Sequence, residues 1–165
     1  MDNAERIFSN LVSEYGEKLY WHVRGIVGSH DDANDVVQDV FAKAWRSISS
    51  FRGDSTAFTW LWKIATNEAL NFLRRQRIRN FFSLDGSGAD TVTGDPFFDG
   101  DEAERKLRKA IDALPAKQKT VFCMRYFEEL PYEEISRITG TSEGALKATY
   151  HFAAEKIRES VQIAD

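Results

Sequence analysis

The sequence has little of several features on which other classes of protein depend. Its 165 residues include one cysteine, Cys123, so no internal disulfide or cysteine-ligated metal cluster can form, which favours a reducing compartment. No apolar stretch approaches the ~20 residues of a membrane-spanning helix. The first residues, MDNAERIF, are acidic and lack the basic segment and apolar run of a secretory signal. These absences argue against a secreted scaffold, a zinc ribbon and membrane insertion, and they predict a cytoplasmic protein.

Strand patterns are missing as well, because apolar and polar residues alternate nowhere over the length of a strand. Apolar residues instead recur every three or four positions, which is the spacing of amphipathic helices. A first helix ends at Gly28, and Ser29 with Asp32 resembles a capping box that starts the next one. Further helices are predicted near 31–48, 59–77, 101–113, 116–128 and 132–139, with a last one to about 161. The predicted fold class is all-α.

Charge is distributed unevenly along the chain, whose net value is -4. Residues 80–100 contain four aspartates and no lysine or arginine, and they are rich in glycine, serine and threonine. This composition is typical of an extended, acidic linker. We therefore predict two small helical domains, 1–80 and 101–165, joined by a linker at 81–100.

Basic residues gather at the end of the third predicted helix, where Arg74, Arg75, Arg77 and Arg79 fall within six positions. Two interpretations stay open: a solvated helix end that favours positive charge, and a patch that faces phosphates. On the same helix, spacings of four, four and three place Lys63, Asn67, Asn71 and Arg74 on the side away from the apolar stripe.

The second half contains a short helix at 132–139, a turn at Gly140–Ser142 and a longer helix. This is the arrangement of a helix-turn-helix, although helix pairs of this kind are common in all-α proteins.

Patterns typical of catalysis are few. The aspartates at 31, 32, 35 and 39 have helical spacing, but none of the three histidines belongs to the Glu-x-x-His pairs of helical metal sites. Acids in a first helical turn are also favoured by the helix dipole. There is no glycine-rich phosphate loop and no nucleophile elbow. We expect no enzymatic activity, no cofactor and no metal.

Two stretches resemble the extracytoplasmic-function family of RNA polymerase sigma factors, group IV of the sigma-70 superfamily. DDANDVVQDVFAKAWRSISSFRGDSTAFTWLWKIATNEALNFLRRQR is similar to their second conserved region, and ALPAKQKTVFCMRYFEELPYEEISRITGTSEGALKATYHFAAEKIRES to their fourth. The resemblance covers nearly the whole chain, and the FRGDSTAFTWL run is its specific signature. It implies a transcription initiation factor that joins core RNA polymerase, through the β′ clamp helices and the β flap, and directs it to promoters. It also implies an anti-sigma factor as a partner.

The resemblance assigns roles to particular residues of the first domain. Asp35, Gln38 and Asp39 match the helix face that meets the clamp helices. For the minus-ten element, an unpaired base needs aromatic stacking and amides that read its edge. The matching positions are Phe51, Arg52, Ser55, Thr56, Trp62, Lys63, Asn67, Asn71, Arg74 and Arg75. Trp60 borders Leu61 and Ile64, and we expect it in the core, whereas Trp62 is expected to border the path of the DNA.

In the second domain, the start of the recognition helix would read the minus-thirty-five element. Its candidate residues are Ser142, Glu143, Gly144, Lys147 and His151. Glu143 also fits a first-turn acid with no contact to DNA. Family members often carry arginines where this chain has Thr149, Phe152 and Ala154, so phosphate anchoring by this helix is expected to be weak. Pro131 replaces the usual capping serine of the preceding helix, at a cost of ~1 kcal/mol.

Two other functions fit parts of the sequence. A DNA-binding response or repressor protein, with a ligand-sensing first half, would explain the helix-turn-helix but not the polar face of residues 62–71 or the four arginines. An all-α metal hydrolase using the acids of residues 31–39 would need a metal. The sequence favours the initiation factor.

Overall fold

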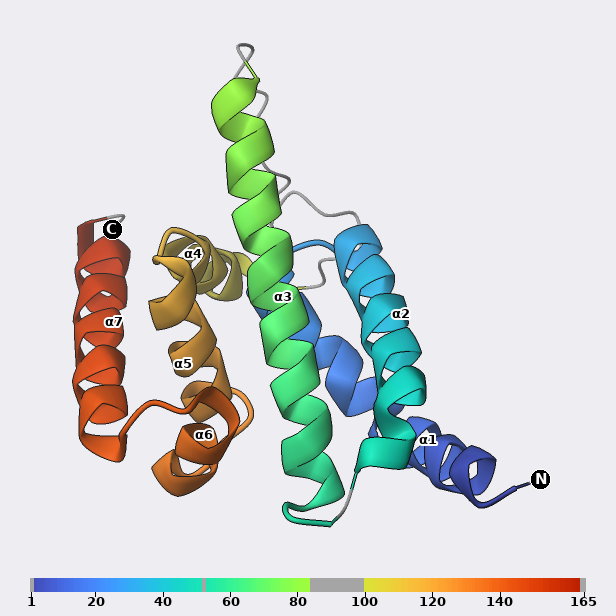
Figure 1. The fold of residues 1–165 in the computed structure, drawn as a ribbon. Helices are drawn as coiled ribbons and strands as arrows, with labels where there is room; N and C mark the ends of the chain where they lie inside the picture. The colour runs from blue at the N-terminus through green and yellow to red at the C-terminus, as the bar shows by residue number, and fades with distance from the viewer. Residues whose placement is uncertain (1, 52, 84–99, 164–165) are drawn as a thin grey trace.

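The computed structural model describes residues 2–51, 53–83 and 100–163, and over these residues the chain is helical without strands (Figure 1). The first half contains α1 (Asn3–Val27), α2 (His30–Ser47), the short 3-10 helix η1 (Ile48–Ser50) and α3 (Ala57–Phe82). The second half contains α4 (Glu102–Asp112), α5 (Ala116–Tyr126), α6 (Tyr132–Thr139) and α7 (Glu143–Ile163). The all-α prediction is confirmed, and α3 continues past position 77 to Phe82, two residues into the predicted linker. Most of that linker, 84–99, lies outside the described residues.

Side-chain caps define where several helices begin. Ser29 Oγ accepts a hydrogen bond from Asp32 N at 3.2 Å, as the capping pattern predicts. Thr56 Oγ1 caps α3 in the same way by accepting from Thr59 N at 3.1 Å. Pro131 stands at the start of α6 without a side-chain cap. Gly140 ends α6 with φ of 76°, a left-handed conformation that suits glycine.

Helices α1, α2 and α3 pack against one another around an apolar core. The fully buried members of this core include Leu19, Val23, Ile26, Val40, Leu61 and Ala65. Helices α4, α5 and α7 surround a second cluster that contains Ile111, Phe122, Ala153 and Ile157. The amphipathic stripes of the sequence therefore bury the faces that their spacing predicts.

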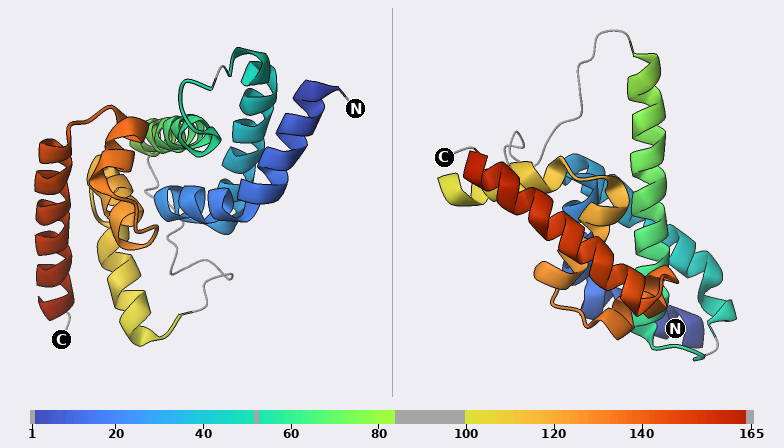
Figure 2. Two further views of the ribbon diagram at one scale, coloured as in Figure 1. Left: turned by 90° about the horizontal axis from the view of Figure 1, so that it is seen from below. Right: turned by 90° about the vertical axis from the view of Figure 1, so that its left-hand side faces the viewer.

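The two halves of the chain are in direct contact. Helix α6 packs on the first half of α3, and α5 packs on α1 (Figures 1 and 2). Val121, Met124, Ile135, Ile138 and Leu146 belong to the same apolar cluster as the core of α1–α3. The described residues thus form one packed body, in which the end of α3 projects beyond the other helices (Figure 1). None of the described helices has both the length and the hydropathy needed to cross a membrane.

Candidate nucleic-acid and polymerase interface

One face of α3 collects most of the polar residues that the sequence singles out. Lys63, Asn67, Arg74 and Arg75 are exposed and Asn71 is half-buried, while Leu61, Ala65 and Ala69 on the other side of the helix are buried. The Arg74 guanidinium donates to the Asn71 side-chain oxygen. The structure therefore places a row of amides and cations on one open face, with the arginines toward its carboxyl end. Such a row offers donors and acceptors for base edges and positive charge for phosphates.

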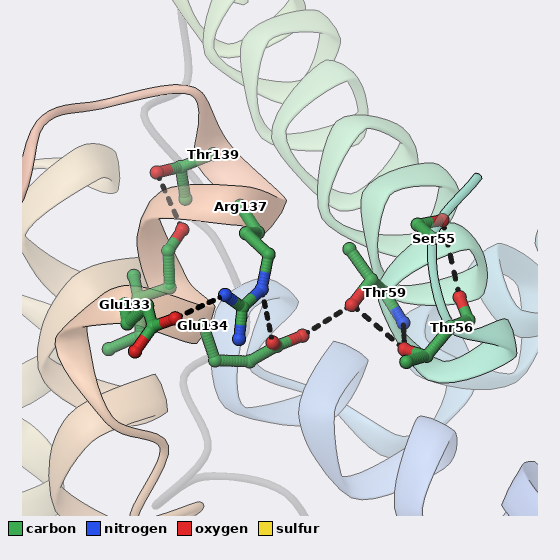
Figure 3. Close-up of polar contacts among 8 residues, drawn as sticks. Ser55, Thr56, Thr59, Glu133, Glu134, Arg137 and Thr139 are labelled. Atoms are coloured by element: carbon green, nitrogen blue, oxygen red, sulfur yellow. Dashed lines mark hydrogen bonds and ion pairs between the residues drawn. The ribbon is translucent and has the colours of Figure 1, made fainter.

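The loop before α3 lies at the other end of this face. The Phe51 ring packs at a tilt against Trp60, with 5.0 Å between ring centroids, and both are half-buried. Ser55 Oγ donates to the Thr56 carbonyl at 3.3 Å, while the Thr56 hydroxyl is occupied in capping α3 (Figure 3). Arg52, the remaining candidate of this loop, lies outside the described residues.

Trp62 corrects the prediction that it borders an open path for DNA. Its side chain is only 1% exposed and stacks on Phe58, with 4.1 Å between ring centroids. Tyr15 and His22 pack on its other sides. Position 62 lies on the face of α3 that the second half of the chain covers, so its indole is a core group and cannot stack on a base in this arrangement. Trp60, expected in the core, is half-buried and packs against the edge of the core cluster.

Polar contacts across the two halves centre on Glu128, a residue that sequence reasoning missed. One carboxylate oxygen accepts from the Trp62 indole nitrogen at 2.9 Å, and the other lies 2.6 Å from His22 Nδ1. Because an ionised carboxylate can only accept, the assigned donor is His22 Nδ1. Nε2 of the same imidazole lies 2.9 Å from the Thr66 hydroxyl. Each polar atom of the His22 and Trp62 side chains is therefore paired at this seam.

A second link joins the start of α3 to α6. Thr59 Oγ1 donates to Glu134 at 2.6 Å, and Arg137 forms ion pairs with Glu133 and Glu134 (Figure 3). Thr59 is buried, so its hydroxyl needs this partner. The Thr59–Glu134 hydrogen bond joins residues 75 positions apart, and no local sequence pattern signals it.

A third contact links α1 to α4 and α5. Arg108 donates to the carbonyl of Gly25 at 2.6 Å and pairs with Asp112 at 3.0 Å. Cys123 lies against the same carbonyl, and burial raises the pKa of its thiol, which disfavours the reactive thiolate. Burial also lowers the pKa of the neighbouring Lys119, against the opposing influence of Asp112. Cys123 is therefore a packing residue.

The outer face of α2 presents the three residues matched to polymerase docking. Asp35, Gln38 and Asp39 are exposed, whereas Val36 and Val40 face the core. Beside them, α1 and α2 form an apolar groove of ≈ 440 Å³, lined by Glu5, Phe8, Phe41, Ala42 and Trp45. This combination of exposed acids and an apolar groove suits a partner with basic and apolar side chains.

The start of the helix-turn-helix recognition helix is also open to solvent. The five predicted residues, Ser142, Glu143, Gly144, Lys147 and His151, are all exposed. Ser142 Oγ accepts from Ala145 N at 3.2 Å, so this serine caps α7. The Lys147 ammonium lies 5.8 Å from the centroid of the Tyr132 ring. Glu143 is in the first turn of α7, where an acid is favoured by the dipole whether or not it meets DNA.

A metal site was a competing interpretation of the acids on α2. Across residues 2–51, 53–83 and 100–163, no three histidine, cysteine, aspartate or glutamate side chains converge in a geometry that could hold an ion. His22 and His30 are engaged in hydrogen bonds within the fold.

Comparisons with known proteins identify the family. Residues 11–79 match the model of sigma-70 region 2, and residues 104–157 match that of sigma-70 region 4. The ECF RNA polymerase sigma-E factor of Haemophilus influenzae is 35% identical over 169 residues, covering 96% of this chain and 89% of that protein. The chain belongs to the extracytoplasmic-function sigma factors.

Further relatives agree with this membership. The sigma-E factor of Escherichia coli K12 is 32% identical over 173 residues, covering 96% of this chain and 88% of its own length. The solved structure of the sigma factor RpoE of Bartonella quintana, in complex with the anti-sigma factor NepR, superposes with a TM-score of 0.78 at 26% identity. That match covers 97% of this chain and 99% of RpoE. Helices α6 and α7 are accordingly the helix-turn-helix of a region 4 DNA-binding domain, and the ECF sigma factor acts in transcription initiation.

Proposed function

We propose that this ECF sigma factor binds core RNA polymerase, directs it to specific promoters and opens their minus-ten element. The observation that carries the proposal is the exposed face of α3, on which Lys63, Asn67 and Arg74 stay open although α6 covers another side of the same helix. The sigma factor supplies recognition and strand separation, and it needs no chemistry of its own.

Opening of the minus-ten element needs groups that hold a base outside the stack. Asn67 and Asn71 offer amides to the edges of unpaired bases, and the loop at Phe51–Thr56 lies at the end of the face where a flipped base would be received. Because Trp62 is buried, the aromatic rings next to this loop are Phe51 and Trp60. Arg74 and Arg75 hold phosphates beyond the opened bases.

Docking on core polymerase uses the outer face of α2. Asp39 and Asp35 supply negative charge for a basic helix pair, and Gln38 supplies an amide. The groove beside them, with the exposed Trp45, accepts an apolar side chain of the polymerase. An aromatic anchor next to charged residues is the usual composition of an interface hot spot.

The helix-turn-helix reads the minus-thirty-five element through the start of α7. Lys147 is the cation best placed for a base edge, since a lysine reading guanine contributes ~1–3 kcal/mol of discrimination. We expect Lys147→Ala to reduce transcription at promoters with a proper minus-thirty-five element much more than at promoters that depend on the minus-ten element. Equal losses in transcription assays on both promoter types would assign Lys147 to general anchoring.

While the two halves are packed together, the reading faces of α3 and α7 lie too close to each other to engage both promoter elements at once. Thr59 touches Glu134, and eight residues lead from Glu134 to Ser142. Two lengths limit the distance between the reading face on α3 and the reading face on α7: the extended chain from Glu134 to Ser142, and the rise of α3 from Thr59 to Asn71. Together they allow at most about 55 Å. The two elements are centred about 25 base pairs apart, which corresponds to about 85 Å of duplex. The two halves therefore separate when the sigma factor occupies a promoter.

An anti-sigma factor is the expected negative regulator. The similar RpoE of Bartonella quintana was solved in complex with the anti-sigma factor NepR. A partner that favours the packed arrangement of the two halves would keep both reading faces from acting on one promoter. We place this regulation, like transcription itself, in the cytoplasm.

The proposed function is tested by reconstitution with core polymerase. The purified chain should copurify with core enzyme and support transcription from a subset of fragments in a genomic library. Core enzyme alone, and core enzyme with an Asp39→Lys variant, are the controls. Failure to bind core polymerase, or transcription with no promoter selectivity, would overturn the proposal.

A further inference from the structure

The last turns of α3 carry an exposed apolar cluster that the proposed function does not use. Phe81 is 81% exposed and Phe82 76%, the two highest values among large hydrophobic side chains in the described part of the chain, and Ile78 is 51% exposed. The two phenyl rings pack edge to face, with 5.4 Å between their centroids. The matched region 2 ends at residue 79, so Phe81 and Phe82 lie outside it.

This cluster continues the polar face of α3. After Lys63, Asn67, Asn71 and Arg74, steps of four and three residues lead to Ile78 and Phe81. Residues spaced in this way lie on one side of an α-helix. The face thus changes along its length from amides to arginines to aromatic rings, and its final part projects beyond the other helices (Figures 1 and 2).

The charge around the cluster indicates the kind of partner. Arg74, Arg75, Arg77 and Arg79 are all exposed, and no acidic residue occurs between Glu68 and Phe82. Cations interleaved with exposed aromatic rings suit a polyanion that also offers apolar surface. Nucleic acid has both properties, in its phosphates and in its bases.

We propose that Phe81 and Phe82 contact the promoter duplex immediately upstream of the minus-ten element, with Arg77 and Arg79 on its phosphates. This inference rests on the proposed function, which places the opened base at the loop before α3. The duplex upstream of that base then runs along α3 toward Phe81 and Phe82. Ten residues separate Asn71 from Phe81, which corresponds to about 15 Å of helix or roughly four base pairs of duplex. At that position the phenyl rings meet thymine methyl groups or a partly unstacked base step.

The first test compares two DNA probes bound by holoenzyme assembled from core polymerase and the full chain. One probe contains the duplex upstream of the minus-ten element, and the other is trimmed at its upstream edge. The Phe81→Ala/Phe82→Ala variant should bind the long probe about five- to fiftyfold more weakly and the trimmed probe as tightly as wild type. Ile7→Ala, which removes an exposed apolar side chain from α1, should leave both affinities unchanged.

The outcomes separate this proposal from the proposed function. Equal affinity of the double variant and wild type for the long probe overturns the contact, as does an equal loss on both probes. If wild-type holoenzyme binds neither probe, the proposed function itself fails.

A second measurement locates the contact directly. A benzophenone amino acid in place of Phe81 should crosslink, in holoenzyme, to DNA about four base pairs upstream of the bases read by Asn71. Crosslinking only to a polymerase subunit overturns the proposal. A second outcome would also overturn it: the wild-type chain binds phosphatidylserine vesicles, and the double variant loses this binding but keeps its promoter affinity. The cluster would then be a membrane contact.

Discussion

The two faces of α3 differ in what covers them. Thr59, Trp62 and Thr66 are buried and paired with residues of α1, α6 and the segment after α5. Lys63, which follows Trp62, and Asn67, which follows Thr66, are exposed. One face of α3 therefore holds the two halves together, while the other stays exposed, and we propose that the exposed face binds DNA. Substitutions on the first face should change stability and domain separation, and those on the second should change binding alone.

The largest expected effect is on the buried face, at Trp62. Trp62→Ala removes a fully enclosed indole and leaves Glu128 without one donor, so we expect a loss of about 3–5 kcal/mol in the free energy of unfolding. Urea denaturation measures it. Trp60→Ala is the matched control, because that half-buried ring packs on Phe51 and should cost clearly less. Equal losses at the two positions would contradict the difference between the faces.

Glu128 tests whether the contact between the halves can be broken selectively. Glu128→Ala leaves the buried His22 imidazole and the Trp62 indole without an acceptor, at a cost of about 1–3 kcal/mol. A compact chain of this length has a radius of gyration of about 15 Å, and scattering should show a larger value for the variant.

Glu133→Ala is the control for this experiment, because Glu133 pairs with Arg137 on its own helix. Its radius of gyration should equal that of wild type. An unchanged radius for Glu128→Ala would mean that the apolar contacts alone hold the halves together.

Asp39 extends the comparison to the exposed face of α2. Asp39→Lys should leave the free energy of unfolding within about 0.5 kcal/mol of wild type, since the side chain is exposed. Affinity for core polymerase should fall by about 1–3 kcal/mol through lost charge complementarity. A titration with labelled core enzyme measures the affinity, with Glu159→Lys on α7 as a charge-reversal control. Unchanged core affinity in the folded Asp39→Lys variant would rule out this docking face.

The smallest expected effect concerns Asn71 on the open face of α3. Asn71→Ala removes one amide, and a single hydrogen bond to an unpaired base corresponds to roughly a fivefold change in open-complex formation. Core binding and thermal stability should not change. Permanganate footprinting on the cognate promoter measures strand opening, and a footprint equal to that of wild type would exclude Asn71 from base recognition.

Local sequence determined the helices and the faces that each one presents. The helical spacing of apolar residues, the cap at Ser29 and the Gly140 turn are properties of neighbouring residues, so they could be predicted without knowledge of the fold. The same periodicity placed Lys63, Asn67, Asn71 and Arg74 together, because residues three and four apart share a side of a helix whatever surrounds it. The family motifs added the expected roles, which remain predictions at each residue.

Only the tertiary structure decided how the two halves meet. The spacing along α3 is equally compatible with an exposed or a buried Trp62, because its burial depends on residues far away in the sequence: Tyr15, His22 and Glu128. Glu128 carries no motif, and its importance follows from its position between His22 and Trp62, 106 and 66 residues away in sequence. Contacts over such separations depend on which apolar faces pack together across the whole molecule, and no local pattern contains that information.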